Sequence, residues 1–444
     1  MSENGPTDTP AAGELSNVLG VAFGLAGSVG GTIGAGILRN PGLVAAQLPS
    51  AGLIMTTWLV GGVYALLGAI CIAELAAALP RAGGWTVYAE EAFGRRAGLV
   101  VGWCDWMAHC IGLAWVSTTL GAFLSGLIPI NSPTLAVGVI VLFSSIQLFG
   151  VRAGGTSQEL LSLGKAGALL TLVAACFLVP SVGGPAEPVS PEPTAFPSGP
   201  ALLVPIVMAL QAVITTYDGW ASPVYFAEEF KEPAQDLPRS LIGGVFAVMA
   251  LYLLINAALL HVLPLPVLAS AQIPAADAAE IVLGEWGHSV ITVVAVLALL
   301  GLINTVVMAA PRILYRMGLA GLRPIALTQV SEGGTPVPAL LITAGTSSIL
   351  IVAGTFEHLL AIGAVLYVAL PLSGLAALAT LRRQKPDLAR PFCCWGYPFT
   401  PLLVGAVSLA FLMAAAISEP RDCLIALGLT ALGGLLKPED RTTA

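Results

Sequence analysis

The sequence of 444 residues is poor in charge. Only 10% of its residues are Asp, Glu, Lys or Arg, while 57% are hydrophobic and the mean hydropathy is +0.89. A soluble domain carries about 25% charged residues, so this composition excludes an ordinary soluble protein and indicates an integral membrane protein. The formal net charge is −7 and no run of basic residues occurs, so we expect no nucleic-acid partner.

Motifs of enzymes and metal sites are also missing. The sequence has no H-E-x-x-H, no G-x-S-x-G and no cluster of Cys and His, and its seven cysteines fall mostly in apolar stretches. The inner loops are too short for a phosphate-binding ATPase domain. We therefore expect no enzyme, no cofactor and no metal. The polar, acidic residues 1–15 lack the basic start of a signal peptide and are expected to form a disordered cytosolic tail.

Long apolar stretches dominate the remainder. Windows of about 20 residues predict twelve membrane-spanning helices: 18–47, 52–79, 97–128, 134–150, 157–181, 201–229, 240–264, 284–318, 337–355, 358–381, 399–417 and 421–436. Most Lys and Arg fall on one side if both termini lie in the cytosol, as the positive-inside rule requires. The expectation is an all-α protein of the cell (inner or plasma) membrane, surrounded by lipid, with both termini cytosolic.

The centre of the first span is glycine-rich. Residues 30–36 read GGTIGAG, and each glycine inside a helix costs about 1 kcal/mol relative to alanine. Open backbone in a bilayer must line a cavity or bind a ligand. The N-terminus of a half-helix attracts anions and the preceding carbonyls attract cations, so an amino acid zwitterion would suit both. The alternative is a set of glycines that allows close helix packing.

The sixth span is interrupted in a similar way, over residues 215–223. Pro223 fits the first turn of a new half-helix, Gly219 adds flexibility, and Asp218 is the only carboxylate expected at the membrane midplane. Interrupted helices at corresponding positions of two halves indicate a transporter built from inverted repeats. A channel would instead need a continuous polar path.

These breaks divide the chain into segments. The expected organisation is a tail (1–15), helices one to five (16–182), a proline-rich outer linker (183–200), helices six to ten (201–383), an inner loop with helices eleven and twelve (384–437), and a cytosolic tail (438–444).

Five motifs carry a family resemblance: GGTIGAGI; AELAAALPRAGGWTVYAEEAFG; FAEEFKEPAQDLPRS; PRILYRMGLAGLRP followed by GGTPVPALL; and LRRQKPDLARPFCCWGYPFTP. In this order they cover nearly the whole chain, which resembles a permease of the amino acid–polyamine–organocation (APC) superfamily, in its L-type amino acid transporter branch. The resemblance implies a LeuT-like 5+5 inverted repeat with broken helices 1 and 6, plus two further helices. It also implies secondary active amino acid transport by alternating access, without ATP hydrolysis and without sodium.

The resemblance also implies a substrate site. The amide groups of Gly34, Ala35 and Gly36 would bind the substrate carboxylate, and the carbonyls of Thr32, Thr215 and Asp218 would face its ammonium. Relatives often have an aromatic lid where this chain has Thr215, so Tyr217, Trp220 or another aromatic residue is the expected replacement. The outer loop LIPINSPT lacks the cysteine by which eukaryotic members attach a glycoprotein. We therefore expect a free-standing bacterial transporter without a glycoprotein heavy chain.

Lys165 is the candidate for coupling. In sodium-independent relatives a lysine on this helix takes the place of a sodium ion between helices one and eight, where Asn304 and Thr305 would lie. The alternative is a lysine that reaches the cytosolic surface, since it lies only about nine residues into the span 157–181.

Other polar residues leave alternatives open. Asp218 could contact a cationic or hydroxylated substrate, carry a coupled proton, or cap the following half-helix. Asp105 and His109, four residues apart, could relay protons or pack as polar neighbours. The charged residues at inner helix ends are expected to form ion pairs or helix caps: Glu74, Glu228, Glu229, Asp236 and Arg239. The transport substrate is expected to be an amino acid; the alternative is a polyamine or organic amine permease, with Asp218 receiving the second ammonium.

Overall fold

The computed structural model describes residues 15–125, 129–180, 203–353, 356–418 and 420–438, and the regular elements in these ranges are helical. The predicted tail 1–15, linker 183–200 and tail 438–444 lie almost entirely outside these ranges.

The helices follow the apolar pattern of the sequence. The first half of the chain forms α1 (Val21–Thr32), α2 (Gly36–Gln47), α3 (Ala51–Ala78), α4 (Trp85–Phe93), α5 (Arg95–Ser125), α6 (Ser132–Leu148) and α7 (Val151–Leu178). The second half forms α8 (Leu203–Thr216), the 3-10 helix η2 (Ser222–Glu229), α9 (Pro233–Val262), α10 (Leu265–Ser270), α11 (Pro274–Leu283), η3 (Gly284–Trp286), α12 (Gly287–Leu319), η4 (Ile325–Thr328), α13 (Val337–Ala353), α14 (Phe356–Gln384), α15 (Phe399–Ser418) and α16 (Pro420–Gly434).

Several of these helices are long and apolar enough to cross a membrane. Within the described ranges seven helices qualify, or eight if α1 and α2, which meet at an angle of 47°, are counted as one broken span. The helices α6, α8 and α13 are apolar but shorter. The chain is therefore a multi-pass membrane protein. By length and hydropathy alone, the described helices account for seven or eight of the twelve predicted spans.

The structure differs from the prediction in three ways: in the number of short helices, in the type of one helix and in the start of another. The helices α4, α10 and α11 were not predicted, because they are too short for a window that searches for membrane spans. The second half of the sixth span is a 3-10 helix and not an α-helix. Finally, α7 begins at Val151 rather than at residue 157, directly after Gly150, whose φ of 102° favours glycine. Lys165 consequently lies in the middle of α7.

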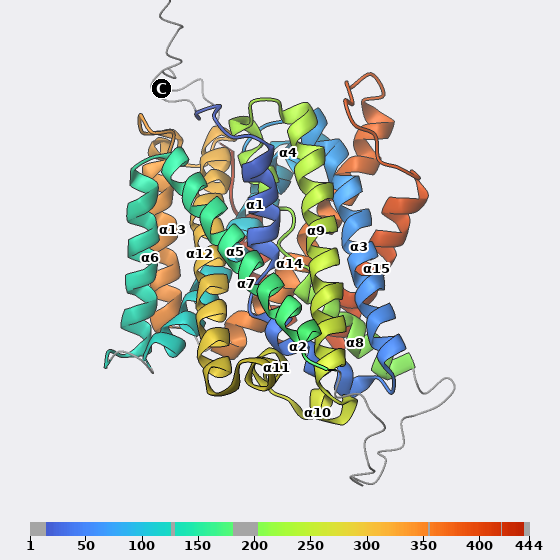
Figure 1. The fold of residues 1–444 in the computed structure, drawn as a ribbon. Coiled ribbons are helices and arrows are strands. Elements are labelled where there is room, and N and C mark those ends of the chain that lie inside the picture. Colours follow the sequence, from blue (N-terminus) through green and yellow to red (C-terminus); the bar gives the residue numbers. More distant parts are fainter. Residues whose placement is uncertain (1–14, 126–128, 181–202, 354–355, 419, 439–444) are drawn as a thin grey trace, which may run out of the picture.

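The helix α1 occupies the interior of the bundle. It packs against α7, α9 and α12, and Figure 1 shows it between α7 and α9, with α6 and α13 toward one edge of the molecule and α3 and α15 toward the other. The short helices α10 and α11 lie at one end of the bundle and α4 lies at the opposite end (Figure 1). This arrangement places the break between α1 and α2 deep inside the protein.

Candidate functional site

The two interrupted helices touch each other at their breaks. Gly219 has a φ of 97°, and a Cβ atom built on it would lie 2.2 Å from the carbonyl oxygen of Gly31. A Cβ atom on Gly31 would in turn lie 2.6 Å from the carbonyl oxygen of Gly219. Neither position has room for a side chain, so glycine at both lets the backbones meet.

Tyr252 of α9 joins the two breaks, and the sequence prediction missed it. Its hydroxyl group lies 3.0 Å from the carbonyl oxygen of Thr32 and 3.2 Å from that of Thr216, and the side chain is fully buried. Both carbonyls are released by the breaks, so one donor serves two unwound ends. A tyrosine within an otherwise apolar span was the only sequence signal for it.

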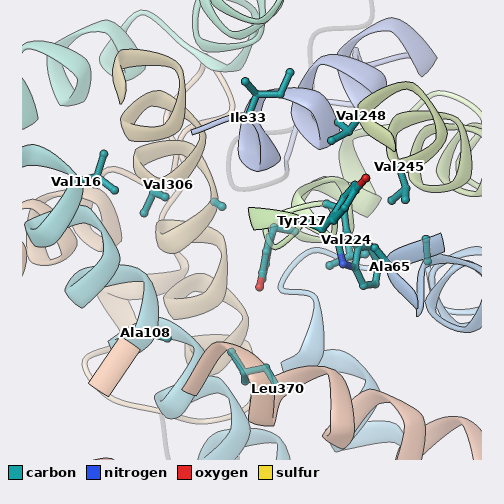
Figure 2. Packing of buried hydrophobic residues seen from close by; sticks show 14 of the residues in the cluster. Ile33, Ala65, Ala108, Val116, Tyr217, Val224, Val245, Val248, Val306 and Leu370 are labelled. Atoms are coloured by element: carbon teal, nitrogen blue, oxygen red, sulfur yellow. The ribbon is translucent and has the colours of Figure 1, made fainter. Parts of the chain in front are cut away.

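A cavity of about 680 Å³ opens beside the breaks. Most predicted site residues line it: Thr32, Gly34, Ala35, Gly36, Thr215, Tyr217, Asp218, Trp220 and Thr305. Lys165 and Asn304 do not. Figure 2 shows Val116 and Val306 on neighbouring helices and Tyr217 beside Ala65, all four of which line the cavity. The cavity wall is thus apolar apart from the backbone at the breaks and a few polar side chains.

The glycines of the first break fall into two groups. A Cβ atom on Gly30 would lie 1.8 Å from Nε2 of the buried Gln158 and would displace that side chain, whereas at Gly31 the obstacle is backbone. A Cβ atom on Gly34 would meet only Leu302 at 3.7 Å, and one on Gly36 would meet Thr216 at 3.4 Å. Packing therefore explains the first two glycines but not Gly34 and Gly36, which line the cavity.

Lys165 is fully buried. Its Nζ donates to the carbonyl oxygen of Gly30 at 2.6 Å and to that of Ile33 at 2.8 Å. The alternative of a lysine that reaches the surface is therefore wrong, because the helix begins earlier than predicted. A Cβ atom on Gly301 of α12 would lie 3.2 Å from Nζ, so the ammonium lies between α1 and α12.

Asn304 belongs to an adjacent polar network. Its Nδ2 donates to Oε1 of Gln158 at 2.9 Å, and its Oδ1 accepts from Nε2 of Gln147 at 3.1 Å. Ser157 also donates to Oδ1, at 3.3 Å. Asn304 thus ties α12 to α6 and α7 and does not contact Lys165 through any of these bonds.

Around the second break, Asp218 and Thr215 are exposed to the cavity that they line. The helix η2 begins after Ala221 without a side-chain cap, so the capping role considered for Asp218 is wrong. Tyr217 is buried, packs its ring against those of Trp58 and Tyr252, and donates its hydroxyl to the carbonyl oxygen of Trp58 at 3.2 Å. Tyr217 is thereby fixed in the cavity wall.

One end of the bundle is closed by ion pairs. Nε of Arg312 lies 3.0 Å from Oε1 of Glu229, and both side chains are fully buried. Glu74 pairs with Arg382 at 2.5 Å and with Arg390 at 3.2 Å. These contacts bear out the ion pairs expected for Glu74 and Glu229, and Glu228 accepts a hydrogen bond from the amide of Ala82 at 3.2 Å.

The helix α4 adds three further ion pairs at this end, formed by two of its glutamates. Glu90 pairs with Arg316 at 2.6 Å, and Glu91 binds both Arg81 and Lys385. The hydrogen bond from Lys385, followed by that from Arg81, lowers the pKa of Glu91 despite its partial burial. These ion pairs therefore fix α4 to α12, to the residues before α4 and to the residue that follows α14 at this end of the bundle.

The cavity extends in the opposite direction. From α2 its lining includes Gly36, Arg39, Asn40 and Leu43, which follow successive turns of that helix, whereas no residue before Gly31 or after Ser222 on the two broken segments lines it. His109 of α5 also lines the cavity. On the two broken segments the cavity thus runs from the breaks along α2. On α3 and α14 its lining reaches Ile72 and Leu375, which approach the ion-paired end, but the paired residues Glu74, Glu229, Arg312 and Arg382 do not line it.

Fold and site together define a multi-pass membrane protein whose interior cavity is built on the unwound backbone of two broken helices. A family model described as amino acid permease matches residues 15–422. The chain therefore belongs to the amino acid permease family of the APC superfamily, and like the members of that family it is not an enzyme.

Individual relatives agree with this assignment. The chain is 27% identical over 437 residues to the serine/threonine exchanger SteT of Bacillus subtilis (strain 168), covering 95% of each chain. It is 27% identical over 437 residues to the b(0,+)-type amino acid transporter 1 of Mus musculus, covering 95% of this chain and 87% of that one. It is also 27% identical over 419 residues to the Asc-type amino acid transporter 1 of Mus musculus, covering 91% and 77%.

Proposed function

We propose that this protein is a sodium-independent secondary amino acid transporter that works by alternating access, either as an exchanger or coupled to protons. The observation that carries the proposal is the meeting of two helix breaks at one cavity, because such breaks offer amide donors and carbonyl acceptors together at mid-membrane. Its membership of the amino acid permease family and its similarity to amino acid exchangers support the same substrate class.

The substrate carboxylate would bind the amide groups of Gly34, Ala35 and Gly36. These residues lie at the start of α2, which has no side-chain cap, and the first amides of a helix lack partners within it. The helix dipole adds attraction for an anion there. Gly34 and Gly36 line the cavity and carry no side chain, which lets a carboxylate approach the backbone closely.

The substrate ammonium would bind carbonyl oxygens of the breaks, those of Thr32, Thr215 and Asp218. Thr32 and Thr216 already accept hydrogen bonds from Tyr252, which holds both unwound ends in a fixed relation. A carbonyl oxygen has two lone pairs, so Thr32 can accept a second donor. Trp220, in the cavity wall, would cover part of the bound substrate.

Lys165 would act in the place of a sodium ion. Its ammonium binds two carbonyls of the α1 break and lies against α12, so it links the helix that binds substrate to a neighbouring helix without any metal. Asn304 and Thr305 of α12 would take part in the same coupling. Asn304 would act through its hydrogen bonds to α6 and α7, and Thr305 through its place in the cavity wall.

The proposed architecture has twelve transmembrane helices in a LeuT-like 5+5 inverted repeat, with 16–182 and 201–383 as the repeats. Support comes from the positions of the two breaks and from helices found at each of the twelve predicted stretches. The proposed location is the cell membrane, with both termini cytosolic and no glycoprotein heavy chain. The ion-paired end would then face the cytosol and the cavity would open outward.

A second candidate is a permease for polyamines or other organic amines. Asp218 is the only carboxylate among the described residues that line the cavity, and it is exposed to the cavity. A second ammonium group on the substrate could bind there. Amino acid transport ranks first because the breaks offer both amide groups that attract an anion and carbonyl groups that attract a cation, and a zwitterion binds both kinds of group.

Counterflow in proteoliposomes tests the proposal. Vesicles loaded with unlabelled serine should accumulate labelled serine, threonine or alanine from sodium-free medium, with putrescine as the amine comparison. Accumulation of putrescine without any amino acid would favour the amine permease. A strict sodium requirement would contradict the role assigned to Lys165.

A further inference from the structure

A histidine and an aspartate lie side by side between the cavity and the ion-paired end. Nδ1 of His109 is 2.8 Å from the backbone carbonyl oxygen and 3.1 Å from Oδ1 of Asp105, one turn away on α5. The Asp105 side chain is fully buried, and its Oδ2 has no hydrogen-bond partner among the residues that the structure describes. Ionisable side chains in a membrane interior are rare and usually functional.

The hydrogen bonds of His109 indicate which nitrogen can take up a proton. Both atoms near Nδ1 are acceptor oxygens, so Nδ1 must carry a hydrogen; this tautomer is assigned from the acceptors. No hydrogen bond to Nε2 is found within the described part of the chain, and His109 lines the cavity. A proton can therefore reach Nε2 from cavity water while Nδ1 keeps its bonds to Asp105.

The charge of the pair depends on that proton. With Asp105 ionised and His109 neutral, the pair carries one negative charge in an apolar interior. A proton on Nε2 turns it into a neutral ion pair, which is favoured where water is excluded. Entry of water to Asp105 would remove this preference, because a hydrated carboxylate is stable without its imidazolium partner.

The neighbouring titratable groups leave this charge uncompensated. Those acting on the pair are Tyr225 of η2, Tyr367 of α14, Asp218 of the second break and Cys104 of α5 itself, none of which is cationic. The basic residues Arg312 and Arg316 of α12 are paired with Glu229 and Glu90, the latter on α4.

The other helices packed against α5 add no cation beside the pair. The helices α6 and α13 contain no ionisable residue. The ionisable residues of α16, namely Arg421, Asp422 and Cys423, lie at its start, while its hydrogen bonds with α5 are made farther along, by Leu429, Thr430 and Gly434.

Tyr225 connects the pair to the closed end. Its hydroxyl donates to Oδ1 of Asp105 at 3.0 Å, and its carbonyl oxygen accepts from the amide of Gly83 at 3.3 Å. The same helix η2 ends at Glu228 and Glu229, which bind the Ala82 amide and Arg312. Opening this end of the bundle must move η2, and with it the hydroxyl group that shields Asp105 from water.

We propose that the His109–Asp105 pair is a proton-binding site that makes transport proton-linked, with one proton carried along with each amino acid. The proposal rests on the amino acid transport proposed above. A proton from cavity water adds to Nε2 of His109 while the cavity is open along α2. After η2 has moved and water reaches Asp105, the same proton leaves Nε2 for water on the other side. No other bond is formed or broken.

The test measures protons moved per amino acid in proteoliposomes that contain a pH-sensitive dye and take up labelled serine or alanine. We expect about one proton per amino acid for the wild type and a ratio at least about tenfold lower for Asp105→Asn and His109→Gln. His261→Gln is the matched control: His261 binds the carbonyl oxygen of Val179 and does not line the cavity, so it should keep the wild-type ratio. The ratio does not depend on how fast a variant transports.

Tyr225→Phe distinguishes a proton site from polar packing. Loss of the hydroxyl donor should leave more of the negative charge of Asp105 to attract the imidazolium of His109, so the pH midpoint of uptake should move upward while the proton ratio stays near one. This variant keeps both proposed groups and decides the question if Asp105→Asn and His109→Gln fail to insert.

The outcomes separate the two proposals. Net uptake of amino acid by the wild type into vesicles that hold no amino acid, without any proton movement, would overturn the proton site and leave the transport function intact. Unchanged proton ratios in both variants, or an unmoved pH midpoint in Tyr225→Phe, would also overturn it. Absence of counterflow for every amino acid would refute the transport function, and the proton site with it.

Discussion

Nζ of Lys165 lies 2.6 Å from the carbonyl oxygen of Gly30, so the middle of α7 is tied to the last turn of α1 just before its break. In the proposed function, this buried ammonium held by carbonyl oxygens would act in place of a bound cation. The contact joins the break that would bind substrate to α7, none of whose residues lines the cavity.

The Lys165 contact predicts sodium-independent transport and a specific defect when it is lost. Lys165→Ala should leave two carbonyls of α1 without their donor, which costs about 1–3 kcal/mol for each buried group. We expect turnover in counterflow to fall by more than about tenfold while equilibrium binding changes by less than about threefold. Arg152→Ala, an exposed cation on the same helix, is the control and should behave like the wild type.

Gly34 and Gly36 should respond to substitution differently from Gly31. A Cβ atom at Gly34 or Gly36 would make only contacts of ordinary van der Waals length, at 3.4 Å or more, so Gly34→Val and Gly36→Val should fold but lose substrate binding by about two orders of magnitude or more. Gly31→Ala, which would bring Cβ to 2.6 Å from the Gly219 carbonyl oxygen, should instead fail to fold stably. Thermal unfolding in detergent with and without serine measures both effects. Normal uptake by Gly34→Val and Gly36→Val would exclude the proposed carboxylate site.

Asp218 decides between the two substrate classes. Its carbonyl group serves any amino acid, so Asp218→Asn should leave the affinity for alanine and leucine within about threefold of the wild type. A substrate whose second cationic group pairs with this carboxylate would lose much more affinity, since removing one partner of a buried ion pair costs about 3–5 kcal/mol. Binding of alanine, leucine, arginine and putrescine is to be compared. Selective loss of putrescine by about a hundredfold would make the amine permease the better conclusion.

The Glu229–Arg312 pair should stabilise the closed end far more than an exposed pair does. Both side chains are fully buried, so Glu229→Gln should cost about 3–5 kcal/mol. Glu91→Gln removes a partner from the half-exposed Arg81 and should cost at most about 1 kcal/mol. The melting temperatures of the two variants give the comparison. Equal shifts would show that Glu229 is compensated elsewhere.

Replacing both members of the buried pair extends this test. Glu229→Leu combined with Arg312→Leu leaves no buried charge and should recover most of the stability lost in Glu229→Gln. The double variant should still transport poorly, because the contact that closes this end is gone. Normal counterflow by the double variant would show that the pair has no part in closing the ion-paired end.

Composition and local chemistry determined the class of protein and the positions of its breaks. Long apolar runs specify membrane helices, because backbone groups in lipid must bond within their own segment. The glycines of residues 30–36 and the run from Thr215 to Pro223 disfavour such bonding within their own segment, so both breaks could be located from the sequence. The charged residues at helix ends were likewise predictable, since ions avoid the bilayer centre.

Tertiary structure decided what each polar residue contacts. The contact of Gly31 with Gly219, the bridge from Tyr252 and the burial of Lys165 all join residues far apart in the chain. Hydropathy describes how much of a helix is apolar but does not fix its rotation about its axis, so it cannot say that Asn304 turns to Gln158 while Thr305 lines the cavity. That choice follows from helix packing, and packing depends on all neighbouring helices at once.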